Sequence, residues 1–164
     1  MNWPADLWEQ ASYIVTVIGL PFAIWVFLKQ ERAERENEEE EAYLLLADAY
    51  DEFLKVVLAH SDLQLRTQTA LENPTPEQRE RMQVIFEMLI SLFERAYLVA
   101  WKPEMSESEK RRWNSWDDAM REWCARDDFF FLLPQLLRGE DAAFAAHLQQ
   151  VAKEVRGTGL VLNA

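Results

Sequence analysis

Glycine, proline and cysteine are scarce in this sequence, and acidic residues outnumber basic ones. The 164 residues include four glycines and six prolines beside 49% hydrophobic residues, which excludes collagen-like and low-complexity chains and predicts a buried core. Cys124 is the single cysteine, so the sequence excludes an intramolecular disulfide and a cysteine-based zinc cluster. With 17 lysines and arginines against 29 aspartates and glutamates, the net charge is -12. This acidity argues against broad attraction to nucleic acid or to anionic lipid headgroups.

Sequence motifs that carry enzymatic chemistry are also missing. The sequence holds no glycine-rich phosphate loop, no HExxH zinc motif and no nucleophile elbow, and Cys124 has no histidine close to it in the sequence. His60 and Asp62 are close enough to suggest a metal or proton-transfer pair, but no third ligand has a suitable spacing. We interpret this pair as a polar cluster in a loop. We therefore predict a protein that is not an enzyme and that binds no metal and no cofactor.

A long apolar run lies near the N-terminus. Residues 11–28 contain no charged side chain, and a helix of this length spans roughly 27 Å, close to the hydrocarbon thickness of a bilayer. We predict a transmembrane helix that is retained as an anchor, because the residues before it are acidic, unlike the positive start of a cleaved signal peptide. Lys29, Arg32 and Arg35 follow the run and no lysine or arginine precedes it. The positive-inside rule then places the N-terminus outside and the C-terminal part in the cytoplasm.

Small and weakly polar residues recur on one face of this predicted helix. Ser12, Thr16, Gly19 and Ala23 follow one another at spacings of four, three and four, which places them on the same side of a helix. In lipid, such a face permits close helix packing or, in a ring of copies, forms a polar pore lining. The alternative interpretation is that these residues share a face by chance. Pro21 removes a backbone hydrogen bond within the run and predicts a kink.

The rest of the chain shows helical periodicity, without a strand pattern or an internal repeat. A charged segment without helix breakers follows the apolar run, so the first helix should continue to about Ala59. Two capping boxes, at Thr75 and at Ser106, each predict the start of a further helix. We predict an all-α fold in which the transmembrane helix continues into a cytoplasmic bundle of four or five helices. The predicted parts are an extracytoplasmic tail at 1–10, the transmembrane helix at 11–28, a charged stalk at 29–41, the bundle at 42–156 and a tail at 157–164.

Two adjacent charged residues, Glu94 and Arg95, interrupt a strongly apolar helical segment. A charge in such a position can be drawn into the core as half of an ion pair. We therefore expect a structural ion pair with Arg121 or Arg126.

Cations and large rings are interleaved in one short helical segment. On an exposed surface, Lys110, Arg111 and Arg112 could hold phosphates while Trp113 and Trp116 stack on the bases of a single strand. However, the spacing of the tryptophans places them on one helix face, which indicates burial in the core. We expect buried rings beneath surface cations. A nucleic-acid ligand is the lesser alternative, because the net charge opposes it.

Two segments, FERAYLVAW at 93–101 and WNSWDDAMREWCARDDF at 113–129, resemble a family of small bacterial membrane-anchored proteins with a tryptophan-rich helical domain of unknown function. The resemblance covers roughly residues 40–150. It implies an all-helical domain behind an N-terminal anchor in the bacterial inner membrane, and it supplies no catalytic residues. The chain departs from the family after the cysteine-containing helix, where Asp127-Asp128-Phe129 stands where a basic or aromatic residue is usual.

These features favour a non-catalytic single-pass membrane protein that acts by self-association, with the bundle controlling how the transmembrane helices meet. Such an architecture suits a gated pore or ion-channel effector in bacterial antiphage defence. The alternative is a membrane-tethered adaptor that binds a protein partner through its acidic helical domain. A lesser alternative is a sensor of single-stranded nucleic acid or of a nucleotide, coupled to the membrane helix.

Overall fold

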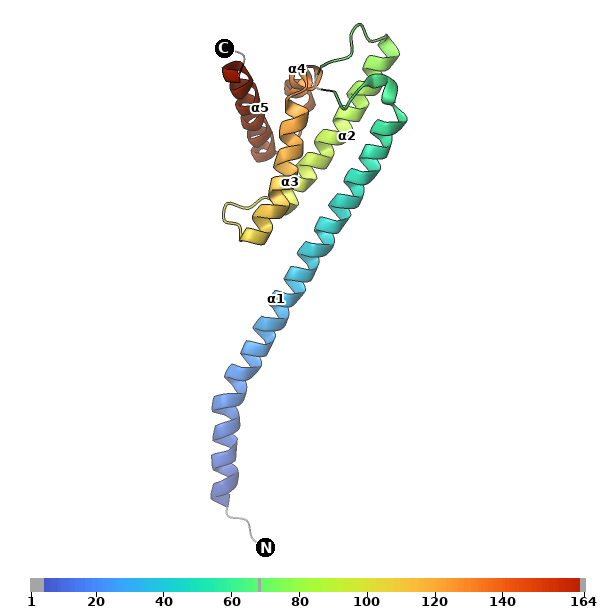
Figure 1. Cartoon of the computed structure of the whole chain (residues 1–164). Helices are drawn as coiled ribbons and strands as arrows, with labels where there is room; N and C mark the ends of the chain where they lie inside the picture. The colour runs from blue at the N-terminus through green and yellow to red at the C-terminus, as the bar shows by residue number, and fades with distance from the viewer. Residues whose placement is uncertain (1–4, 68, 163–164) are drawn as a thin grey trace. The chain divides into compact units, whose positions relative to one another are not determined.

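The computed structural model describes residues 5–67 and 69–162, and the side chains of residues 22–31, 34, 40–67 and 69–157. Within this part the chain is helical and has no strand (Figure 1), which confirms the predicted all-α fold. The elements are α1 (Ala5–Ala59), the 3-10 turn η1 (Ser61–Leu63), α2 (Pro76–Ala100), α3 (Glu107–Cys124), α4 (Asp127–Leu136) and α5 (Ala142–Leu162).

The chain divides into two compact units at a point within α1. Unit 1 comprises Met1–Ala42 and unit 2 comprises Tyr43–Ala164. The sequence predicts that the first helix continues through the charged segment 29–41, and α1 does so without interruption. The reason is local, because this segment consists of strong helix formers and contains neither glycine nor proline. Residues 43–59 of α1 belong to unit 2, which is described below.

The described part of unit 1 contradicts the predicted membrane location. No helix among the described residues has an apolar stretch long enough to cross a membrane. Of the predicted span at 11–28, the described side chains begin at residue 22, and residues 22–28 extend over about 10 Å of helix before Lys29. The hydrocarbon core of a bilayer is about 30 Å thick. The prediction of an inner-membrane protein with its N-terminus outside and its C-terminal domain in the cytoplasm is therefore wrong on this finding.

The two capping boxes begin α2 and α3 as predicted. The Thr75 hydroxyl accepts a hydrogen bond from the Gln78 amide at 3.2 Å, and the Gln78 side chain accepts one from the Thr75 amide at 3.0 Å. Ser106 and Glu109 repeat this exchange at 3.4 and 2.7 Å. Each box satisfies amide donors that the first turn of a helix leaves without partners. The starting points of both helices are therefore set by residues three positions apart.

Two other helix ends differ from the prediction. The sequence predicts a break and a new N-cap at Ser61 and Asp62, but these residues form one 3-10 turn that ends in a left-handed Gln64 with a φ of 51°. A loop then leads to α2. The sequence also predicts a last helix to about Val155, whereas α5 continues to Leu162. Glycines near its end cost only about 1 kcal/mol each in a helix, which is too little to end it by themselves.

The core of unit 2 is formed around α3, which packs against α2, α4 and α5 (Figure 1). Its buried face carries the tryptophan stripe that the spacing predicts, with Trp113, Trp116 and Trp123 all under 10% exposed. The α2 helix contributes a long row of buried apolar side chains. Those of α2 with no exposed surface are Phe86, Leu89, Ile90, Phe93 and Ala96.

Candidate functional site

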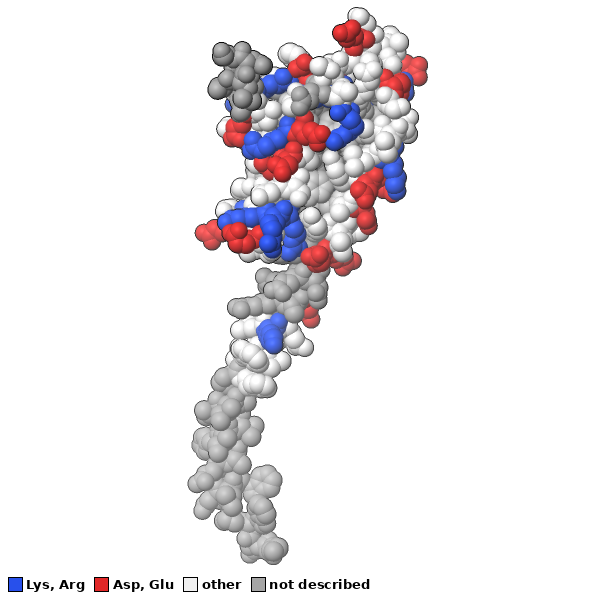
Figure 2. Space-filling view, in the orientation of Figure 1, with Lys and Arg blue, Asp and Glu red and all other residues white. Residues whose placement is uncertain are grey.

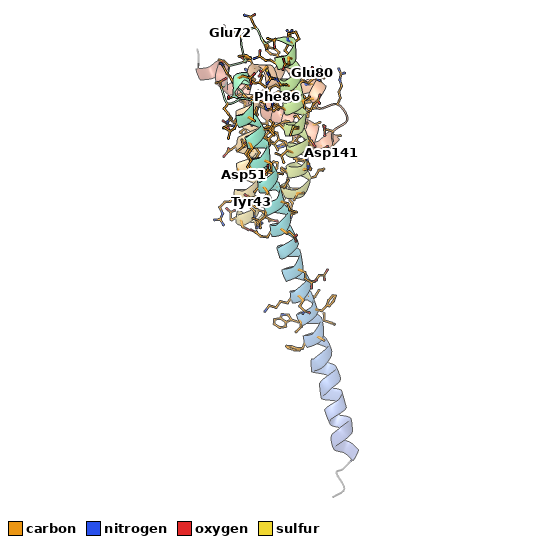
Figure 3. The ribbon with its side chains drawn as sticks, turned by 90° about the vertical axis from the view of Figure 1, so that its right-hand side faces the viewer. Tyr43, Asp51, Glu72, Glu80, Phe86 and Asp141 are labelled. Carbon is orange, nitrogen blue, oxygen red and sulfur yellow. The ribbon has the colours of Figure 1, made fainter. Side chains whose placement is uncertain are left out.

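An open groove lies between α1 and α2, on the side of unit 2 that faces the viewer in Figure 3. It consists of two adjoining hollows of about 600 and about 290 Å³, which share Val56 and Met88. We call it the α1–α2 groove. Its apolar lining consists of Ala49, Phe53 and Val56 from α1 and of Val84, Ile85, Met88 and Leu92 from α2. No sequence pattern predicted this surface.

The indole of Trp123 contacts aromatic rings of both helices that form the groove. It contacts the ring of Phe53 in α1 at a centroid distance of 5.8 Å and the ring of Phe86 in α2 at 6.2 Å, both edge on. Trp123 lies on α3 and is 2% exposed, so it enters between the two helices from the interior of the bundle. The distance between packed helices depends on the side chains at their contact. With three large rings below them, α1 and α2 do not close over the space at the surface.

Large apolar side chains are exposed along this groove. Val84 is 51% exposed and Met88 is 43% exposed. Leu45 and Val99 lie one turn beyond the hollows on the same helix faces, and they are 63% and 44% exposed. Single exposed apolar residues are common on protein surfaces, but several of them beside one groove indicate an interaction surface. Such a row could have been detected in the sequence as apolar residues left over on the polar side of each helix.

Polar groups border the groove. At one end Arg81 pairs with Asp62 at 2.8 Å, and hydrogen bonding to this guanidinium lowers the pKa of the Asp62 carboxyl. His60 lines the same hollow, where its Nδ1 donates to the carbonyl oxygen of Val56 at 2.9 Å. The predicted polar cluster of His60 and Asp62 is thus divided between two different partners. At the other end the larger hollow is bordered by Arg95.

The expected ion pair of Glu94 with Arg121 or Arg126 is not formed. Glu94 instead accepts a hydrogen bond from the amide of Asp141, just before α5. Both Arg121 and Arg126 are engaged by other carboxylates. Arg95 donates to the carbonyl oxygen and the hydroxyl of a serine one turn earlier in α2, at 3.2 and 3.3 Å. Among the described side chains, Arg95 therefore has no carboxylate partner.

The rings of the predicted ligand surface lie in the core. Trp113 is 7% exposed and Trp116 is 6% exposed, and both pack against other aromatic residues. Lys110 pairs with a carboxylate of its own helix at 3.0 Å, Arg112 lies over a tyrosine ring at 5.7 Å, and Arg111 is exposed. On the face drawn in Figure 2, basic and acidic side chains are mixed over the bundle. Both tryptophan rings are thus buried, whereas a stacking platform for bases needs exposed rings.

Among the described side chains, Arg126 is the buried charge, and the sequence did not predict its role. It is 1% exposed. Its Nη1 donates to the carbonyl oxygens of Gln64 and Thr67 at 2.7 and 2.8 Å, and its Nη2 donates to the Asp128 carboxylate at 2.8 Å. These bonds tie the loop after α1 to the start of α4. A buried charge with this many partners is structural.

Two groups with catalytic potential are altered by burial. Burial raises the pKa of the Cys124 thiol to about 12, so the thiol stays protonated at neutral pH and is a poor nucleophile. Burial also lowers the pKa of His147, whose ring lies against Tyr97 and Trp113. Within the described residues, no group of three or more histidine, cysteine, aspartate or glutamate side chains could hold a metal ion.

The predicted packing face of the N-terminal helix is described at one position. The side chains of Ser12, Thr16 and Gly19, and that of the predicted kink residue Pro21, lie outside the described residues. Ala23 is described and exposed.

Comparisons with protein-family models, with curated proteins and with solved structures found no match for this chain. The resemblance to the family of small bacterial membrane-anchored proteins therefore stays a prediction. A function has to be argued from the geometry of unit 2.

Proposed function

We propose that this chain is a non-catalytic adaptor whose helical bundle binds a helix of a protein partner in the α1–α2 groove. The proposal is based on the open groove itself, with Val84 and Met88 exposed on its α2 wall. The apolar face of an amphipathic helix commonly fills a groove of this kind. Its burial removes apolar surface from water, which is the main favourable term in protein association.

The groove has the length of a short docked helix. From Ala49 to His60, α1 rises about 16 Å, which corresponds to about three helical turns. A partner helix of this length presents apolar side chains at positions i, i+3 or i+4, and i+7 on one face. Such a stripe would lie along the two hollows, over Val56 and Met88.

Self-association is the second candidate, and a separate observation favours it. In unit 1 the side chains of Phe22, Trp25 and Phe27 are 62%, 57% and 64% exposed. Contacts between copies of the chain would cover such side chains. The gated-pore version of this function depends on a membrane location that the described helices contradict, so it is not part of the proposal.

Site-specific photo-crosslinking in cells tests the adaptor function. A benzophenone amino acid replaces Met88 in the groove or, as the matched control, Leu58, which is 74% exposed on α1 outside the groove. We expect a discrete crosslinked product of the chain with another protein from position 88 and none from position 58. Equal products from both positions, or none from position 88, would contradict binding in the groove. A product with twice the mass of the chain would instead identify a second copy as the occupant.

A further inference from the structure

We infer that the helix bound in the α1–α2 groove carries a carboxylate, from aspartate or glutamate beside its apolar stripe, that pairs with Arg95. This inference rests on the proposed function and specifies the chemistry of the partner. It is based on the position and the bonding of Arg95, which borders the larger hollow next to Leu92 and Ala49.

Arg95 bonds differently from the arginines of unit 2 that pair with a carboxylate. The exposed Arg79, Arg111 and Arg138 also form no ion pair within the described residues, but among these unpaired arginines Arg95 is the one that lines the groove. The guanidinium groups that pair with a carboxylate include those of Arg66, Arg81, Arg121, Arg126 and Arg156. Arg95 bonds instead to Ser91 in its own helix. The charge that borders the groove is therefore not neutralised by an ion pair within the described part of the chain.

The bonds to Ser91 also orient the guanidinium. They use Nε and Nη2 of Arg95, which leaves Nη1 without a hydrogen-bond partner among the described residues. Glu52 lines the same hollow from α1, but it is engaged by Lys55 at 2.6 Å. A carboxylate entering with a docked helix would meet a planar, already oriented donor group, and this geometry suits carboxylates.

The test uses the full chain with ¹³C-labelled methionine methyl groups and two synthetic helical peptides. Each peptide has about 16 residues, enough for about four turns, with leucines at helical spacing along one face. The peptides differ at one position beside the first leucine, which is glutamate in one and lysine in the other. The methyl signal of Met88 reports binding in the groove, and the signals of the buried Met82 and Met120 are internal controls.

We expect the glutamate peptide to shift the Met88 signal with a dissociation constant about two- to fivefold lower than that of the lysine peptide, as one partly exposed ion pair allows. The preference should shrink in high salt, because salt screens exposed charges. Arg95→Glu should reverse the preference. Arg138→Glu, an equal change of charge at an exposed position outside the groove, should leave the preference unchanged.

Two outcomes overturn the inference, and they are distinguishable. If both peptides shift the Met88 signal with equal affinity, or if Arg95→Glu does not alter their order, the groove binds helices but Arg95 does not select a carboxylate. If neither peptide shifts the Met88 signal, the groove does not bind amphipathic helices, and the proposed function fails together with the inference. Circular dichroism of Arg95→Glu confirms that the variant is folded before either conclusion is drawn.

Discussion

The ring of Phe53 in α1 meets the indole of Trp123 in α3 edge on, with ring centroids 5.8 Å apart and ring planes at 66°. The same indole meets Phe86 of α2 at 6.2 Å. The two walls of the α1–α2 groove thus share one support that comes from a third helix. A change at this support should affect stability and groove shape together.

The first prediction concerns Trp123→Ala. Removing a buried indole leaves a cavity and deletes three aromatic contacts, with Phe53, Phe86 and Phe129, so we expect the free energy of unfolding to fall by about 3 to 5 kcal/mol. Urea unfolding followed by circular dichroism measures this loss. Trp101→Ala is the control, because Trp101 is only partly buried and should cost less. Equal losses for the two variants would show that Trp123 is not a special support.

The second prediction concerns Arg126→Met. This change leaves the Asp128 carboxylate, which is 16% exposed, without its guanidinium partner, so we expect a loss of about 3 kcal/mol, at the low end of the range for buried pairs. The loop after α1 also loses the donors to the carbonyl oxygens of Gln64 and Thr67. We therefore expect faster amide hydrogen exchange in this loop, measured by mass spectrometry. Arg138→Met, at an exposed arginine, should change the free energy of unfolding by no more than about 0.5 kcal/mol. If amide hydrogen exchange in this loop were unchanged in Arg126→Met, the hydrogen bonds of Arg126 would not be what holds the loop in place.

The third prediction concerns the pH dependence of the cap at α3. Hydrogen bonds from Lys102 and Ser106 lower the pKa of the Glu109 carboxyl from 4.5 to about 2. Because the folded pKa lies below the unfolded one, this stabilisation is fully present above about pH 4.5 and is lost as the pH falls towards 2. We expect Glu109→Gln to melt below the wild type at pH 7, with a difference that shrinks between pH 4.5 and 2.

The matched control for the third prediction is Glu107→Gln, since the Glu107 side chain is 86% exposed in the same first turn. Its melting temperature should stay close to that of the wild type at each pH. Thermal unfolding at a series of pH values measures all three proteins. A difference between Glu109→Gln and the wild type that is constant from pH 7 to pH 2 would show that the Glu109 carboxyl does not stabilise the cap as an anion.

Much of the candidate site was not predictable from the sequence, and Arg95 illustrates why. Its position in an apolar helix indicates a charge that needs a partner, and the sequence therefore predicts a structural ion pair. Arg95 finds no carboxylate among the described side chains and bonds to Ser91, while Arg121 and Arg126, the partners suggested for the neighbouring Glu94, pair with other carboxylates. Which charges meet depends on how helices pack, and spacing along one helix carries no information about that.

The sequence by itself determined the local structure of this protein. The all-α fold follows from helical periodicity, and the starts of α2 and α3 follow from Thr75 and Ser106, because a capping box needs only residues three positions apart. Only the tertiary structure decided that α1 and α2 leave a groove between them. That groove depends on Trp123 entering between Phe53 and Phe86, three rings from three helices. Contacts between distant parts of the chain are set by packing of the whole core, which no local pattern specifies.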